Sequence, residues 1–155
     1  MDEQHAILVN EIRYAERLTQ RTARLYRRAA TACTFIAILG GGSFMASFTT
    51  AAPNWLKLLA LGLFSIAGAT ALSVRPLEKA LTNEADARKY ATLRTQAVTM
   101  LTQDLRAALQ KARETDAAEI ELLRDVAYND LLMEIGRQDL QAKLTPSQKL
   151  LEAMA

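Results

Sequence analysis

Residue types that carry out most enzyme chemistry are sparse in this sequence. His5 is the only histidine and Cys33 the only cysteine, so one chain has too few of these ligands for a His/Cys metal site, and no disulfide can form within it. Paired carboxylates such as Asp125 and Asp130 fit ordinary helix surfaces, because no apolar or aromatic pocket is suggested around them. We therefore predict no catalytic residues, no metal and no cofactor, and we expect that the protein is not an enzyme.

The glycine-rich run also fails to indicate a nucleotide site. Gly40-Gly41-Gly42 lies inside an apolar stretch, with no strand before it and no Lys-Ser/Thr after it, so it lacks the context of a phosphate-binding loop. Nucleic-acid binding is not predicted either, because the arginine-rich segment before this stretch runs directly into apolar sequence.

Two apolar stretches, residues 29–48 and 55–74, dominate the chain. Each has 20 residues, enough for a helix to cross a bilayer core of roughly 30 Å. The first holds no charge, and the second holds only Lys57, whose side chain can reach the outer interface. We predict a transmembrane hairpin over residues 29–74. The alternative is a soluble helical bundle, which would have little chain left to cover two such stretches.

The basic residues predict how this hairpin is oriented. Six arginines lie within residues 1–28, further cations follow the second stretch, and the connector between the stretches has none. The positive-inside rule then places both termini in the cytoplasm. The residues expected at the cytoplasmic membrane interface are Arg24, Arg27, Arg28 and Arg75.

The spacing of apolar and basic residues over 3–28 predicts an amphipathic helix. Its apolar side comprises Leu8, Ile12, Ala15, Leu18, Thr22, Leu25 and Tyr26, and its basic side comprises Arg13, Arg17, Arg21, Arg24 and Arg28. Three interpretations of the arginines stay open: a positive-inside flank, a site for anionic lipid headgroups, or a site for an acidic partner or nucleotide phosphate. The apolar side needs cover from the C-terminal arm or from neighbouring copies.

The sequence of residues 75–155 predicts a cytosolic helical arm. Apolar residues at helical spacing favour one long helix from Pro76 to about Arg113, followed by continuation or a tight turn into residues 117–135. Asp116, with Glu119 three residues later, offers a fresh helix start.

Two further signals mark later helix ends. Gly136 is the expected C-terminal cap of a helix, and Thr145-Pro146-Ser147-Gln148 has the layout of a capping box that opens a short last helix. No strand is predicted. The predicted fold class is an all-α membrane protein with an N-terminal amphipathic helix (residues 1–28), a two-helix hairpin (29–74) and a helical arm (75–155).

Small residues recur every four positions within the apolar stretches. They are Cys33, Ala37 and Gly41, Gly42 with Ala46, and Ser65, Ala69 and Ser73. Such spacing lets transmembrane helices approach closely. Two interpretations stay open, because these ridges either close the hairpin within one chain or pack between subunits of a homo-oligomer.

The overall layout resembles the SLATT-type two-transmembrane domains of bacteria. The residues that carry this resemblance are Asn10-Glu11-Ile12-Arg13-Tyr14-Ala15-Glu16-Arg17, Arg24, Tyr26-Arg27-Arg28 and Tyr128-Asn129-Asp130-Leu131-Leu132-Met133-Glu134-Ile135. These domains are membrane effectors associated with nucleotide-sensing and nucleotidyltransferase defence systems. The resemblance implies a multi-pass protein of the bacterial inner membrane.

The resemblance also implies a function. Such an effector oligomerises and permeabilises the membrane in antiphage defence when a cytosolic sensor fires. Because this chain has no recognisable sensor domain, we expect its trigger to be a separate sensor protein or a nucleotide or other ligand bound by the helical arms. Two alternatives stay open, namely a non-conducting membrane anchor that recruits a cytosolic partner and a holin-like small channel.

Overall fold

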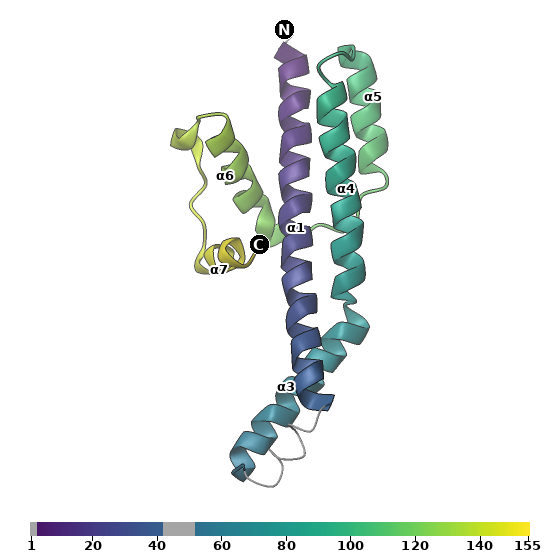
Figure 1. Cartoon of the computed structure of the whole chain (residues 1–155). Helices are drawn as coiled ribbons and strands as arrows, with labels where there is room; N and C mark the ends of the chain where they lie inside the picture. The colour runs from purple at the N-terminus through teal and green to yellow at the C-terminus, as the bar shows by residue number, and fades with distance from the viewer. Residues whose placement is uncertain (1–2, 42–51) are drawn as a thin grey trace. The chain divides into compact units, whose positions relative to one another are not determined.

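The computed structural model describes residues 3–41 and 52–155, and every regular element in this part of the chain is helical (Figure 1). The elements are α1 (Glu3–Gly41), α3 (Asn54–Ser73), α4 (Pro76–Gln96), α5 (Thr102–Arg113), η1 (Glu121–Leu123), α6 (Arg124–Glu134), η2 (Gln138–Leu140) and α7 (Pro146–Met154). The predicted all-α class is confirmed for these residues. The predicted packing residues Gly42 and Ala46 lie outside them.

The chain divides into two compact units. One combines Met1–Leu25 with Lys79–Ala155, and the other is Tyr26–Glu78. The ends of the second unit lie close to the predicted hairpin boundaries. The N-terminal amphipathic helix, however, belongs to the same unit as the C-terminal arm.

A first core joins three helices of the larger unit. Helix α1 contributes Leu8, Ile12 and Ala15. Tyr90 and Leu93 come from α4, Ala97 directly follows α4, and α5 contributes Leu105, Leu109 and Ala112. The C-terminal arm thus covers the apolar side of α1, as one of the two options predicted. Burial of these side chains supplies the main favourable term in folding this unit.

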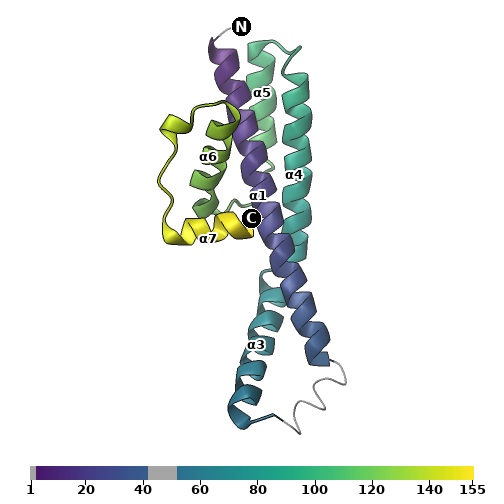
Figure 2. The same cartoon turned by 60° about the vertical axis from the view of Figure 1, so that its left-hand side comes forward.

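The prediction of one helix from Pro76 to about Arg113 is wrong, because the chain turns back over residues 97–101 (Figures 1 and 2). A continuous helix would carry half of its apolar positions beyond the reach of α1. Folding back instead places α5 beside α4, where both bury side chains against Ile12. The turn is tied to α1 by His5, whose Nε2 lies 3.0 Å from the carbonyl oxygen of Ala97.

A second core lies on the other side of α1, where α6 and α7 pack (Figures 1 and 2). It contains Leu18 together with Leu123, Val126, Ala127 and Ala155. Two local predictions are confirmed here. Gly136 follows α6 with a left-handed φ of 74°, which glycine adopts without steric cost, and α7 begins with a complete Thr145/Gln148 capping box.

The predicted helix start at Asp116 and Glu119 is wrong. Residues 116–120 form no helix, and the next element is η1 at Glu121. The reason is that the Asp116 carboxylate accepts hydrogen bonds from Lys89 and Tyr90 of α4 and caps no amide of a following turn.

In the smaller unit, α3 is long and apolar enough to cross a membrane, and it is the one such helix among the residues described. Its bounds agree closely with the predicted stretch 55–74. Ala67 is its one buried residue, whereas Leu58 is 70% and Leu72 81% exposed.

The two apolar segments of this unit approach each other closely at Gly40. A Cβ atom built on Gly40 would lie 2.7 Å from two ring carbons of Phe64, well inside van der Waals contact. The close approach therefore lies one residue before the predicted Gly41.

We predict that Gly40→Leu destabilises the smaller unit by about 1–3 kcal/mol, because the new side chain must displace the Phe64 ring. Thermal unfolding of the detergent-purified protein, followed by circular dichroism, measures the effect. Gly68→Leu is the matched control, since a Cβ there meets no atom within 4 Å. Equal losses of stability in both variants would contradict the assigned contact.

Candidate functional site

Three arginines of α1, which we call the arginine face, lie against α6: Arg13, Arg17 and Arg21. Arg21 makes the strongest of these contacts. Its Nε and Nη2 donate to the two carboxylate oxygens of Asp130 at 2.8 and 2.9 Å, and its Nη1 donates to the carbonyl oxygen of Glu152 at 3.2 Å. The side chains of Arg21 and Asp130 are 17% and 13% exposed. Such two-pronged contacts between guanidinium and carboxylate are geometrically specific.

The other two members of the arginine face share one carboxylate. Arg17 Nη2 lies 3.0 Å from Glu134 Oε2, and Arg13 Nη1 lies 3.9 Å from Glu134 Oε1. These three side chains are about a third exposed, so each pair is weaker than the Arg21 contact. Arg13, Arg17 and Arg21 thus pair with acidic residues of the chain's own α6, and the three interpretations of the basic side of the helix stay predictions.

The hydrogen bond from Arg21 to Asp130 has an electrostatic consequence. It is the main reason why the pKa of Arg21 is raised, and burial of the side chain only partly opposes it. Because the acid is more than 100 residues away from Arg21 in the sequence, local spacing around α1 gave no indication of it.

The predicted interface arginines Arg24, Arg27, Arg28 and Arg75 are exposed. Arg24 Nε donates to the Gln20 carbonyl oxygen at 3.4 Å, and Arg75 pairs with Glu78 at 3.5 Å. Their location at a membrane interface stays a prediction.

The predicted packing ridges are mostly exposed in the single chain where side chains are described. Ala37, Ser65, Ala69 and Ser73 are all exposed, and Cys33 is half-buried. Ser73 Oγ donates to the Ala69 carbonyl oxygen at 2.6 Å, so its hydroxyl is satisfied within the helix. At 100° per residue, Ala69 lies on the opposite side of α3 from buried Ala67. The ridge on α3 is therefore accessible to a second copy of the chain.

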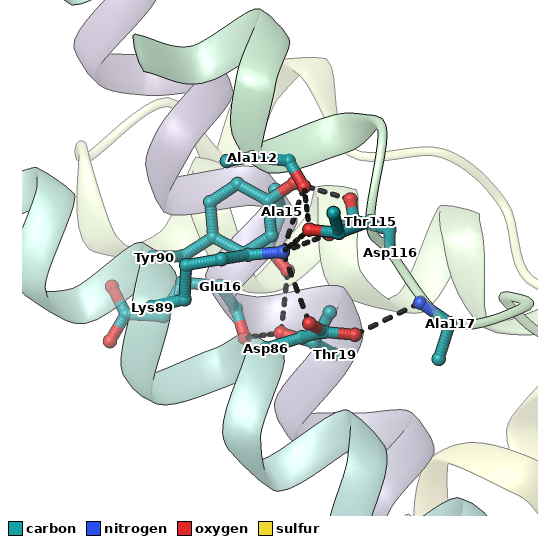
Figure 3. Close-up of polar contacts among 10 residues, drawn as sticks. All are labelled: Ala15, Glu16, Thr19, Asp86, Lys89, Tyr90, Ala112, Thr115, Asp116 and Ala117. Atoms are coloured by element: carbon teal, nitrogen blue, oxygen red, sulfur yellow. Dashed lines mark hydrogen bonds and ion pairs between the residues drawn. The ribbon is translucent and has the colours of Figure 1, made fainter.

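Sequence reasoning missed a polar cluster centred on Lys89 of α4 (Figure 3). The Lys89 ammonium donates to Ala112 O at 2.7 Å, Thr115 Oγ1 at 3.1 Å, Asp116 Oδ1 at 2.7 Å and Asp86 Oδ1 at 3.1 Å. These acceptors belong to α4, to the end of α5 and to the segment after it, so one cation joins three parts of the chain.

Two neighbouring contacts complete the cluster. The Tyr90 hydroxyl donates to Asp116 Oδ2, and the backbone N–H of Ala117 donates to Asp86 Oδ2 at 2.9 Å. The spacing of Asp86 and Lys89 was visible in the sequence as an ordinary helical pair. Their reach to residues 115–117 was not, because it depends on the turn between α4 and α5.

The cluster holds its groups in unreactive protonation states. Burial alone lowers the pKa of Lys89, but hydrogen bonds to Asp116 and Asp86 outweigh burial and leave that pKa raised. Burial and the hydrogen bond to Asp116 raise the pKa of Tyr90 strongly. At neutral pH the amine is thus charged and the phenol neutral, so neither is a nucleophile. The arrangement positions the segment after α5.

Helix α1 also carries buried polar residues in the part that approaches Leu25, where its share of the larger unit ends. Glu16, Thr19 and Thr22 are at most 5% exposed, and Glu16 pairs with Arg94 of α4 at 3.0 Å. Among the described residues, no group of three or more His, Cys, Asp or Glu side chains is placed to hold a metal ion.

No protein-family model, curated protein or solved structure matches this chain. The similarity to SLATT-type domains therefore rests on the quoted residues and on the helical layout, and it stays a prediction.

We predict that the free energy of unfolding falls as the pH rises above about 10. Burial raises the pKa of Tyr14 as well as that of Tyr90. Each phenol therefore stabilises the fold below the ordinary tyrosine pKa of about 10, and this contribution is lost as the pH rises through the folded-state pKa. Denaturant titrations from pH 7 to 11 measure the decline.

Tyr90→Phe should make this alkaline decline shallower without abolishing it, because Tyr14 still contributes. The matched control is Tyr128→Phe, which removes a hydroxyl from a side chain that is 41% exposed and should leave the decline unchanged. If Tyr90→Phe has the same alkaline profile as the parent, the Tyr90–Asp116 contact does not hold the phenolic proton.

Proposed function

We propose that this chain is an integral membrane protein that assembles into oligomers and permeabilises the bacterial inner membrane. The observation that carries the proposal is the exposure of α3. Its leucines and isoleucine point outward around most of the helix, with Leu61 at 61% and Ile66 at 66% exposed. A helix that is apolar all round lies in a protein core or in a bilayer, and the described residues of this chain supply no such core.

Lipid is the natural cover for this surface. Exposed apolar area costs about 25 cal/mol per Å² in water, and the α1 segment in the same unit adds to that area, since Phe35 is 62% and Ile38 68% exposed. We propose that residues 29–48 and 55–74 form a two-span hairpin with both termini in the cytoplasm. The exposed arginines at 24, 27, 28 and 75 then fit the cytoplasmic interface.

Assembly is supported by the exposed ridge of Ser65, Ala69 and Ser73. Two spans enclose no pore, so permeabilisation requires several copies. Small residues at four-residue spacing are the usual contact surface between transmembrane helices, because they let backbones approach closely. The trigger in this proposal is a separate cytosolic sensor protein or a nucleotide signal.

A non-conducting anchor that recruits a cytosolic partner is the second candidate. It is favoured by a groove of about 450 Å³ between α1 and α5. Exposed Ile7 and Arg106 line this groove beside Arg113, which pairs with Glu11 at 3.0 Å. Ile7 and the Arg106 guanidinium are therefore the groups that fit a protein surface with apolar and acidic residues. The two candidates differ on induced leakage.

We predict that inducible expression in bacteria places the chain in the alkali-resistant membrane fraction. At overexpressed levels, where mass action favours assembly without the trigger, it should also cause loss of membrane potential and uptake of propidium. Ala69→Leu should reduce this leakage at least about tenfold at equal membrane levels, because a bulky residue on the ridge separates the helices that must touch. Gly68→Leu is the control, since it adds a side chain to α3 where a Cβ meets no atom within 4 Å.

The outcomes separate the candidates. Insertion with leakage that Ala69→Leu abolishes and Gly68→Leu preserves supports an assembling pore. If the chain inserts but no variant causes leakage, and leakage is still absent when the sensor or signal is supplied, the result favours the anchor. A chain recovered from the soluble fraction contradicts both.

A further inference from the structure

We call residues 121–155, from η1 to Ala155, the C-terminal module. Hydrogen bonds join its elements to one another. The Asn129 side chain donates to the Ala142 carbonyl oxygen at 2.9 Å and accepts from the Ala142 N–H at 2.8 Å. Gln148 Nε2 donates to Asp125 Oδ2 at 2.7 Å. These bonds join α6, the following loop and α7 without using any residue of α1.

The contact between the C-terminal module and α1 combines a small apolar core with ion pairs. In the second core, α1 contributes fully buried Leu18 and partly buried Tyr14 and Leu25, and the module contributes the other fully buried members. The first core takes Leu8, Ile12 and Ala15 from α1. The arginine face also holds the module, through Asp130, Glu134 and the carbonyl oxygen of Glu152. Because α1 fully buries three side chains in the first core and one in the second, ion pairs make up a larger share of its contact with the module than of its contact with α4 and α5.

The connection to the module has a defined hinge position. The Lys89 cluster fixes the chain as far as Ala117 through the N–H bond to Asp86. The next two residues, Ala118 and Glu119, are exposed, and Ile120 already packs against the second core. Residues 118–120 are thus the segment that can change direction while both flanking parts keep their bonds.

We propose that the C-terminal module is a lid that swings off α1 about residues 118–120 and uncovers the arginine face together with Leu18, while the first core stays folded. The uncovered surface is a row of guanidinium groups beside Leu18, Tyr14 and Leu25. Closing the lid neutralises these charges with Asp130 and Glu134. If the chain is the effector proposed above, lid opening is a step that a trigger can use. The lid itself does not depend on that function.

The test measures exposure of Leu18 in the purified full-length protein. In a Cys33→Ser background, Leu18→Cys reports the second core and Leu105→Cys the first, and both leucines are 0% exposed. The rate of maleimide labelling gives the rate or population of opening at each position. Because labelling does not depend on leakage, a failure of the lid and a failure of the pore proposal are distinguishable.

Asp130→Arg opposes Arg21 with a like charge and should speed labelling of the cysteine at position 18 at least about tenfold. Adding Arg21→Asp should restore the rate to within about threefold of the parent. The matched control is Asp139→Arg, the same charge change on the same module, at a side chain that is 64% exposed and pairs only locally with Arg137. Raising the salt from 0.1 to 1 M, which shortens the screening length from about 10 to 3 Å, should also speed labelling at position 18.

The cysteine at position 105 decides between a lid and unfolding. Labelling that accelerates at 18 and stays slow at 105 supports the lid. Labelling that accelerates equally at both positions means that the whole unit opens together, which overturns the proposal. An unchanged rate at 18 in Asp130→Arg overturns it as well, because the module is then not held by the arginine face.

Discussion

The larger unit depends on one helix, α1, being packed on two sides by chemically different surfaces. One side buries Ile12 in an apolar core with residues of α4 and α5. Another side places Leu18, Tyr14 and Leu25 in the second core and offers three arginines to α6. Apolar contact loses little when salt is raised, whereas ion pairs at partly exposed positions are screened, so the contact on the second side depends in part on the surrounding ions.

The polar cluster around Lys89 makes this asymmetry geometrically possible. A partly buried cation is stable when its hydrogen bonds are satisfied, and Lys89, whose side chain is 30% exposed, has acceptors from Asp86, Ala112, Thr115 and Asp116. The two carboxylates are more deeply buried, at 10% and 15% exposure. Such a network holds the segment after α5 in one path, so that α6 begins on the correct side of α1.

Features set by neighbouring residues were predictable from the sequence. Pro76 at the start of α4, Gly136 after α6 and the Thr145/Gln148 capping box each depend on a few adjacent positions, and all three are present. The turn between α4 and α5 was missed, because it follows from competition for the apolar side of α1. The same holds for the partners of Arg21 and Lys89, which the fold brings together across long stretches of sequence.

The two units differ in how their apolar surface is distributed, and this contrast supports the proposed membrane location. In the larger unit, exposed apolar side chains such as Leu122 and Leu150 lie next to charged residues, Glu121 and Lys149, as is normal for a protein surface in water. On α3 they follow one another around the helix, interrupted by Gly62, Ser65 and Ala69. A soluble explanation needs a second continuous apolar surface of similar size, which the described residues do not offer. The proposed bilayer location and the proposed assembly together account for both the large side chains and the small ones, because lipid would cover the leucines and close helix packing would use the ridge.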